Sequence, residues 1–173
     1  MADRNAFEAL KPSLELEEDW RLRLRGQEMI LLPRHFFRYI LEHVERVAGP
    51  QAHHEIFGQA GYDGALAFCR KYHALHGGSP AEVVQAYLDE MSLRGWGHFR
   101  IHAIDVDSGR LEVHLEHSAI VPADDQLSGH VIWRHAMRGA MDFVQEQLGT
   151  QHTLNTEMEE TSDGARLVVA PNP

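Results

Sequence analysis

The clearest pattern along the chain is a strict alternation of apolar and polar residues between Arg94 and Val121. Two alternating runs flank a short polar loop, which predicts an antiparallel hairpin with one apolar and one solvated face. Because the apolar face of such a sheet has to be covered, we expect helices or a bound molecule beneath it. The apolar positions of the two runs are Phe99, Ile101, Ala103, Leu111, Val113 and Leu115.

Before the hairpin, apolar residues recur every three to four positions, and this period predicts three helices. The first spans about residues 34–47 and ends at a Gly-Pro pair, and the second spans about residues 51–75 and ends at a Gly-Gly pair. Ser79 and Glu82 supply the two members of a capping box for the third helix, which Gly95 closes.

After the hairpin, the pattern predicts one long helix over about residues 126–148, followed by two strands. The strands cover about residues 152–157 and 167–169, with a turn at Asp163-Gly164 between them. The predicted fold class is therefore α+β. A mainly antiparallel sheet is covered by helices, and the long helix lies between the central hairpin and the C-terminal strand pair.

A length of 173 residues with 43% hydrophobic residues is typical of one globular domain. Residues 1–19 are acidic and weakly periodic, so we expect them to form a loosely held N-terminal arm. Residues 20–170 then form the single domain, which opens with a small hairpin of alternating Leu and Arg residues.

The composition excludes several classes of protein. A net charge of −10 without a basic run repels phosphate backbones, so no nucleic-acid partner is expected. No segment approaches the roughly 20 apolar residues of a membrane helix, and the N-terminus lacks the apolar core of a signal peptide, so we expect a cytoplasmic protein without a membrane partner. Cys69 stands alone, which rules out an intrachain disulfide, and its apolar neighbours predict a buried thiol rather than a nucleophile.

The second predicted helix contains Gly58, Gly61 and Gly64 at three-residue intervals. Each glycine inside a helix costs roughly 1 kcal/mol relative to alanine, so the three together need a compensating reason. Close approach of another group is such a reason. That group is a second helix, a partner chain or a ligand.

The long helix is apolar around an arc of about 200°, twice the usual width, and therefore needs cover on two sides. The sheet provides one side. The glycine-rich helix, a dimer partner or a hydrophobic ligand provides the other. The arc comprises Ile132, Trp133, Ala136, Met137, Gly139, Ala140, Phe143, Val144 and Leu148.

Catalytic and metal-binding motifs are missing from the sequence despite its 13 histidines. No helix carries a His-x-x-x-His or His-Glu-x-x-His pair, and His130 and His135 point about 140° apart. His102 and His114 are expected to face each other on the polar side of the hairpin as a solvated pair. No nucleophile elbow, phosphate loop or dinucleotide fingerprint is found, so we predict no catalytic residue, no metal ligand and no cofactor.

The order of these parts resembles the 4-vinyl reductase (4VR) domain, a small bacterial and archaeal module regarded as a binder of hydrocarbons or other small molecules. The resemblance runs from about Trp20 to Val169, and its Gly-Trp-Gly junction is the most specific element. The matching segments are EIFGQAGYDGAL from Glu55, RGWGHFRI from Arg94, HSAIV from His117 and HVIWRHAMRG from His130.

The resemblance implies a dimer with an apolar pocket between helices and sheet. Similar domains sense aromatic compounds in phenol-responsive activators, assist chlorophyll-type pigment synthesis and share a fold with subunits of a vesicle-tethering complex. Several carry a zinc site made largely of cysteines. In this sequence His130 stands where the family has a cysteine at the start of the long helix. The family's two cysteines in the C-terminal strand pair are also missing, with residues near Glu160 and Val168 in their place. A thiolate zinc site is therefore excluded, whereas a weaker site of His130 and carboxylates stays open.

We therefore expect a non-catalytic domain that binds a small apolar or aromatic molecule and acts as a homodimeric sensor or accessory protein. One alternative is an enzyme or enzyme accessory in tetrapyrrole or small-metabolite metabolism, and another is a purely structural dimerisation module. The expected ligand-binding residues, chosen from helical arcs and strand alternation, are Gly61, Gly64, Phe68, Tyr72, Trp96, Phe99, His130, Trp133, Met137 and Phe143.

Overall fold

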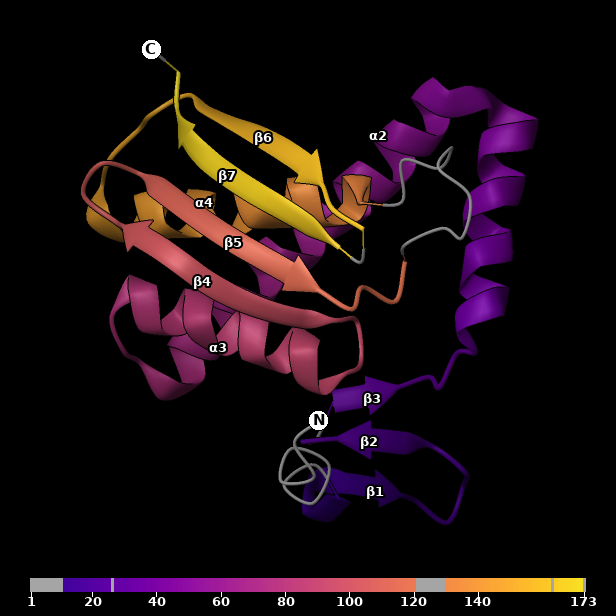
Figure 1. Cartoon of the computed structure of the whole chain (residues 1–173). Helices are drawn as coiled ribbons and strands as arrows, with labels where there is room; N and C mark the ends of the chain where they lie inside the picture. The colour runs from indigo at the N-terminus through magenta and orange to yellow at the C-terminus, as the bar shows by residue number, and fades with distance from the viewer. Residues whose placement is uncertain (1–10, 26, 121–129, 163, 173) are drawn as a thin grey trace. The chain divides into compact units, whose positions relative to one another are not determined.

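The computed structural model describes residues 11–25, 27–120, 130–162 and 164–172, and it confirms the predicted α+β fold. The chain divides into two compact units, Met1–Phe37 and Arg38–Pro173. After a short 3-10 turn at Lys11–Ser13, the elements in chain order are β1 (Leu14–Leu16), β2 (Leu22–Leu24), β3 (Gln27–Met29), α2 (Arg34–His76), α3 (Pro80–Leu93), β4 (His98–Asp105), β5 (Arg110–Glu116), α4 (Val131–Leu148), β6 (Leu154–Glu160) and β7 (Ala165–Pro171) (Figure 1).

The first unit contains a three-stranded antiparallel sheet in the order β1-β2-β3. Its second and third strands form the hairpin that the alternation of Leu and Arg predicts. Strand β1 adds to it from a region that the sequence analysis assigns to the N-terminal arm, and it pairs Leu14 with Leu24. Among the described residues of this unit, Leu24 is the buried one.

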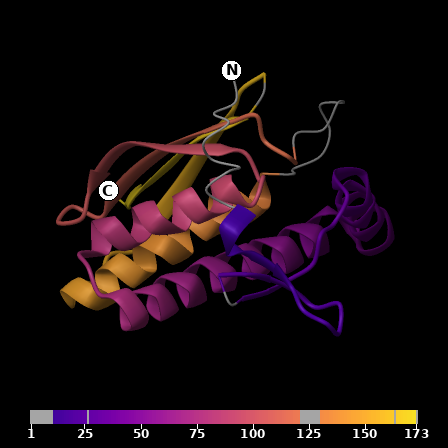
Figure 2. The ribbon, with the colours of Figure 1, turned by 90° about the horizontal axis from the view of Figure 1, so that it is seen from below.

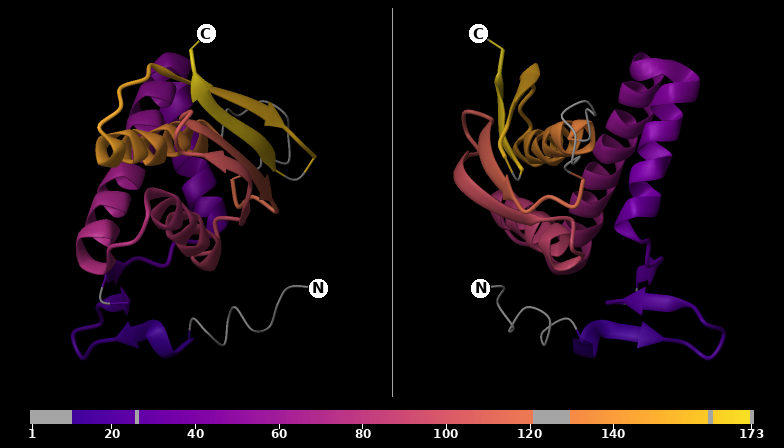
Figure 3. Two further views of the ribbon diagram at one scale, coloured as in Figure 1. Left: turned by 90° about the vertical axis from the view of Figure 1, so that its left-hand side faces the viewer. Right: turned by 45° about the vertical axis from the view of Figure 1, so that its right-hand side comes forward.

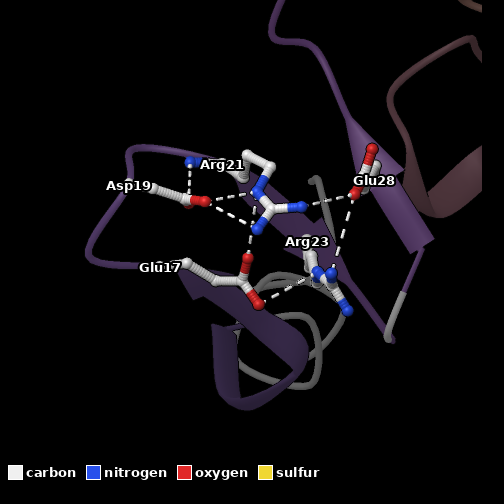
Figure 4. Close-up of polar contacts among 5 residues, drawn as sticks. All are labelled: Glu17, Asp19, Arg21, Arg23 and Glu28. Atoms are coloured by element: carbon white, nitrogen blue, oxygen red, sulfur yellow. Dashed lines mark hydrogen bonds and ion pairs between the residues drawn. The ribbon is translucent and has the colours of Figure 1, made fainter.

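The polar face of this small sheet carries a network of ion pairs centred on Arg21 (Figure 4). The Nε atom of Arg21 lies 2.6 Å from Oδ2 of Asp19, and its Nη1 atom lies 3.2 Å from Oε1 of Glu28. Glu17 links Arg21 to Arg23, whose Nε atom lies 3.1 Å from Oε1 of Glu17. Because most of these side chains are exposed, the pairs contribute little to stability and instead keep this face soluble.

Helix α2 consists of two helical arms that meet at a sharp bend (Figure 3). The bend is at Gly49, whose φ of 86° lies in the left-handed region that favours glycine. Pro50 follows at the start of the second arm, where its missing N–H costs nothing. The Gly-Pro pair thus ends the first predicted helix as expected.

Helix α3 begins with the predicted capping box. The Ser79 hydroxyl accepts a hydrogen bond from the Glu82 backbone N–H, and the Glu82 carboxylate accepts one from the Ser79 backbone N–H. The helix ends before Gly95, and the chain passes through Trp96 to Gly97, whose φ is 141°. At Gly97 an added Cβ would lie 3.1 Å from the Glu116 carbonyl oxygen, so the junction brings α3 directly against the hairpin.

The second sheet has the order β4-β5-β7-β6, and every neighbouring pair is antiparallel. The predicted hairpin and the C-terminal strand pair are confirmed. The prediction that Ala103 lies on the apolar face is wrong. The strand register shifts between Ile101 and Ala103, so Ala103 is exposed and pairs with Glu112. Ile104 then pairs with Leu111 on the covered side.

The second unit is layered, with α3 and α4 on one face of this sheet and α2 beyond them (Figure 2). Helix α4 ends at Gly149 in the left-handed conformation, as predicted. Its expected start near residue 126 lies outside the described residues. The core between sheet and helices includes the fully buried side chains Leu88, Leu111, Leu115, Met137, Met141, Phe143 and Leu167.

Candidate functional site

Two of the three glycines of the second arm of α2 allow α4 to approach its backbone. A Cβ atom added to Gly61 would lie closer than 3.0 Å to the carbonyl oxygen of Ile132, and one added to Gly58 would lie 2.9 Å from Cδ2 of His135. In the same way, a Cβ atom added to Gly139 of α4 would lie too close to the backbone carbonyl group of Tyr62 in α2. Helix packing therefore accounts for these glycines. Gly64 is exposed, and a Cβ atom added there would meet no other group within 4 Å.

The wide apolar arc of α4 is covered from both sides within the second unit. The four-stranded sheet and α3 lie on one side, and the glycine-containing arm of α2 lies on the other. Most of the arc is buried, while Leu148 at its end is 40% exposed. Of the three alternatives that the sequence leaves open for the second side of α4, the structure shows the glycine-rich helix.

Three of the predicted site residues meet at the N-terminal end of α4 as an aromatic cluster. The ring of Trp133 lies 5.5 Å from that of Trp96 and 4.8 Å from that of Phe99, with edge-to-face geometry in both pairs. Trp96 comes from the Gly-Trp-Gly junction, and Phe99 comes from β4. The junction, the hairpin and the long helix therefore contribute one side chain each.

Buried polar atoms without hydrogen-bond partners occur at the start of α4 and on the neighbouring strand β6. Within the described part of the chain, neither Nε2 of His130, nor the indole N–H of Trp133, nor the hydroxyl of Thr156 has a partner. All three side chains are at least nine-tenths buried. Thr156 lies on β6 beside α4, because its carbonyl oxygen accepts a hydrogen bond of 3.0 Å from Nε of Arg134. Unsatisfied buried groups of this kind call for an explanation.

The Nδ1 atom of His130 lies 3.4 Å from Oε1 of Glu160, which is beyond a well-formed hydrogen bond. Burial lowers the pKa of His130 below its ordinary value, while Glu160 acts in the opposite direction. A neutral imidazole has one nitrogen that donates and one that accepts a hydrogen bond. The described residues contain no group of three or more His, Cys, Asp or Glu side chains placed to hold a metal ion.

Other predicted site residues lie in different surroundings. Phe68 stacks on Tyr72 with ring centroids 5.8 Å apart, and Phe68 also contacts Tyr87 of α3. Phe143 faces His73 at 5.6 Å, and Met137 is fully buried in the core. The ten predicted residues therefore do not form a single group.

The unpartnered hydroxyl of Thr156 cannot be found from the sequence, because a lone threonine in an alternating strand carries no signal. The same holds for a contact between His54 of α2 and His135 of α4, whose Nε2 atoms lie 3.0 Å apart. Spacing along one helix cannot reveal a pair that forms between two helices. Cys69 is fully buried as predicted, and burial raises the pKa of its thiol to about 12, so it is no nucleophile.

A polar cleft of about 430 Å³ lies at the C-terminal end of α4. The Tyr62 hydroxyl donates a hydrogen bond of 2.8 Å to Oδ2 of Asp142 at this cleft. Burial and this contact raise the pKa of Tyr62 to about 12, so the phenol stays protonated. None of the predicted site residues belongs to the lining, which is Tyr62, Asp142, Gln145, Glu146, Gly149, Thr150, Gln151 and His152.

These elements define an α+β domain in which helices cover one face of a four-stranded antiparallel sheet. The chain belongs to the family described as "Domain of unknown function (DUF5943)", whose sequence profile matches residues 10–102, more than half of the 173 residues. No curated protein sequence matches it. Among the residues described, no helix is both long and apolar enough to cross a membrane.

Several solved structures share the fold. The phenol-responsive sensory domain of the transcription activator PoxR, solved with phenol, has a TM-score of 0.68 at 13% identity, over 97% of this chain and 89% of that one. A trafficking protein particle complex subunit 3 from Naegleria fowleri, covalently bound to palmitic acid, has a TM-score of 0.51 at 10% identity, over 81% and 95%. A mutant Cs H-NOX protein has a TM-score of 0.50 at 14% identity, over 83% and 74%. At these identities the likeness establishes the fold alone.

Proposed function

We propose that this protein is a non-catalytic binding domain of the 4-vinyl reductase type, whose ligand is a small apolar or aromatic molecule with one polar group. The observation that carries the proposal is that two buried polar groups at the N-terminal end of α4, the indole N–H of Trp133 and Nε2 of His130, have no partner among the described residues, while Trp133 also belongs to the aromatic cluster. The fold supports it, since the similar structures include one solved with phenol and one bound to palmitic acid.

The polar atoms specify what the ligand must carry. A buried donor or acceptor without a partner costs about 1–3 kcal/mol, and a ligand that supplies the partner recovers this free energy. The indole of Trp133 can only donate, whereas the imidazole of His130 can donate or accept. A hydroxyl group meets both requirements, and the rings of Trp96 and Phe99 suit an aromatic body. A phenolic compound therefore fits the cluster best.

The proposed contacts are His130, Trp133, Trp96 and Phe99. The polar cleft at the other end of α4 is a separate feature. Gly61 packs against the backbone of Ile132 and Gly64 is exposed, so neither is assigned a contact with the ligand. Phe68, Tyr72, Met137 and Phe143 support the ligand site from the surrounding core.

The test is a titration of the purified full chain with phenol, followed by calorimetry, and with palmitate as a probe of the second ligand class. Trp133→Phe keeps an aromatic ring and removes the N–H. The variant loses one hydrogen bond to the ligand, so we expect about 3- to 10-fold weaker phenol binding. Trp20→Phe, at a side chain that is 82% exposed, is the matched control and leaves binding unchanged.

The proposal fails if phenol and palmitate both leave the unaltered chain without a saturable heat signal. It also fails if Trp133→Phe binds the ligand as tightly as the control. Native mass spectrometry provides an independent check, because a binding domain retains small apolar molecules from the expression host and a purely structural module does not.

The proposal includes a homodimer that acts as a sensor or accessory protein. Its support is the exposure of large apolar side chains in the first unit, where Trp20 is 82%, Ile30 81% and Leu31 78% exposed. Apolar surface of this kind marks interaction sites. Light scattering should give twice the chain mass, and Ile30→Ser with Leu31→Ser should give the single mass. Trp133→Ala separates the roles, because loss of ligand with an intact dimer supports the binding domain, whereas a monomer supports the dimerisation module.

A further inference from the structure

His54 and His135 bring two imidazole nitrogens together across the contact between α2 and α4. Their Nε2 atoms lie 3.0 Å apart, and the rings are close to perpendicular, with an interplanar angle of 77°. Gly58 makes this approach possible, because a Cβ atom there would lie 3.0 Å from Nε2 of His135. The two histidines come from separate helices that are held by close backbone packing.

The separation of the two nitrogens matches that of two ligands on one metal ion. Metal-to-imidazole bonds of about 2.0–2.1 Å place neighbouring nitrogens about 3.3 Å apart on a tetrahedral ion and about 2.8 Å apart on a square-planar one. The observed 3.0 Å lies between these values. We propose that His54 and His135 form a two-histidine chelate for a divalent late transition-metal ion such as Cu²⁺ or Zn²⁺, with water completing the coordination. This site does not depend on the proposed function.

Protonation is compatible with such a chelate. Burial lowers the pKa of His135, and electrostatic interactions with His54, Arg134 and Arg138 lower it further, which favours the neutral imidazole that a metal ion needs as a ligand. In the metal-free structure, one Nε2–H donates to the other Nε2. When a metal ion binds both Nε2 atoms, the donating ring carries its proton on Nδ1 instead.

The surrounding charges limit the affinity. Arg134 and Arg138 oppose a cation, although Arg138 also faces Asp142, with Nε 3.9 Å from Oδ2. His53 and Glu45 lie on the α2 side, where the negative charge of Glu45 acts on His53. With two protein ligands, the site is weaker than a three-ligand site. Cu²⁺ should bind more tightly than Zn²⁺, as the general order of affinities predicts.

The experiment uses the full chain without a histidine tag, titrated with CuSO₄ and with ZnCl₂ alone. Electron paramagnetic resonance of the Cu²⁺ form should show two coordinated nitrogens, and Zn²⁺ should raise the Tm. His54→Gln and His135→Gln each turn a two-point chelate into a single contact, so Cu²⁺ affinity should fall about 100-fold in each. His43→Gln, an exposed histidine on the first arm of α2, is the matched control and leaves affinity unchanged.

The proposal is overturned if both glutamine variants bind Cu²⁺ as the control does, which would leave the pair as a hydrogen bond only. It is also overturned if His114→Gln causes the same loss, because the ion would then lie at the His102–His114 pair on the sheet. Circular dichroism of each variant shows whether it is folded. The spectroscopic count of nitrogens in the unaltered chain tests the site even if a variant fails to fold.

Discussion

Replacing Gly61 by alanine should lower the free energy of unfolding by about 2–3 kcal/mol. The added methyl group would lie closer than 3.0 Å to the carbonyl oxygen of Ile132, which belongs to the backbone of α4 and cannot rotate away. Restoring an ordinary contact requires α2 and α4 to separate by about 1 Å, which forfeits a quarter to a half of the dispersion energy across their interface. The gain in helix propensity, about 1 kcal/mol, offsets only part of this loss.

Urea denaturation followed by circular dichroism measures the effect, with an unchanged m-value showing that the unfolded state is the same. Gly64→Ala is the matched control on the same helix, because no atom lies within 4 Å of its added Cβ. That variant should be about 0.5–1 kcal/mol more stable than the unaltered chain. The reasoning is refuted if Gly61→Ala is as stable as Gly64→Ala, since the glycine would then have no role in the helix contact.

Three further predictions concern titratable groups. Cys69 should resist alkylation in the folded protein and react only as the protein unfolds in denaturant, because burial removes access and raises the pKa of its thiol to about 12; rapid labelling of the native chain would contradict this. The hydrogen bond from Arg166 lowers the pKa of Glu112 from 4.5 to about 2, so its contribution to stability is complete above pH 4.5 and is lost as the pH falls toward 2. Glu112→Gln should therefore flatten the acid limb of the stability profile, whereas an identical limb would show that the pair is unimportant. Burial lowers the pKa of His53 and His130 below 6.5, so the unfolded chain takes up protons first and the urea midpoint should fall as the pH drops below 6.5. His53→Gln should make the urea midpoint less dependent on pH. A midpoint that rises as the pH falls would contradict the prediction.

Local signals made most of the secondary structure predictable from the sequence. The Gly49-Pro50 break, the capping box at Ser79 and the left-handed Gly149 each depend on residues within one turn of the chain. The first and the third depend on a glycine with positive φ, and the second depends on a side-chain cap. None of these needs a partner that is distant in the sequence.

Long-range geometry accounts for what the sequence left open or missed. The bulge before Ala103 is invisible in the alternation, because an inserted residue keeps a plausible pattern on each side of it. The glycine pattern predicted a close approach, but only the packed helices identify Ile132 as the group that approaches Gly61. The contact of His54 with His135 joins residues 81 positions apart, so no spacing rule applies to it.

The candidate site was predictable in part for the same reason. Alternation and helical periodicity placed Trp96, Phe99 and Trp133 on covered faces, and the structure brings their rings together. The unpartnered state of His130 and Thr156 depends on which polar groups the fold supplies nearby. That information exists only after the sheet and α4 have packed.

The order β4-β5-β7-β6 leaves β4 and β6 as the free borders of the larger sheet. One border is interrupted by its bulge, and the other carries Glu157, Glu159 and Glu160, whose like charges repel an incoming strand of the same kind. Fibril-like growth by strand addition is thereby discouraged on both sides. We therefore expect two copies of this chain to associate through surfaces other than a shared, continuous sheet.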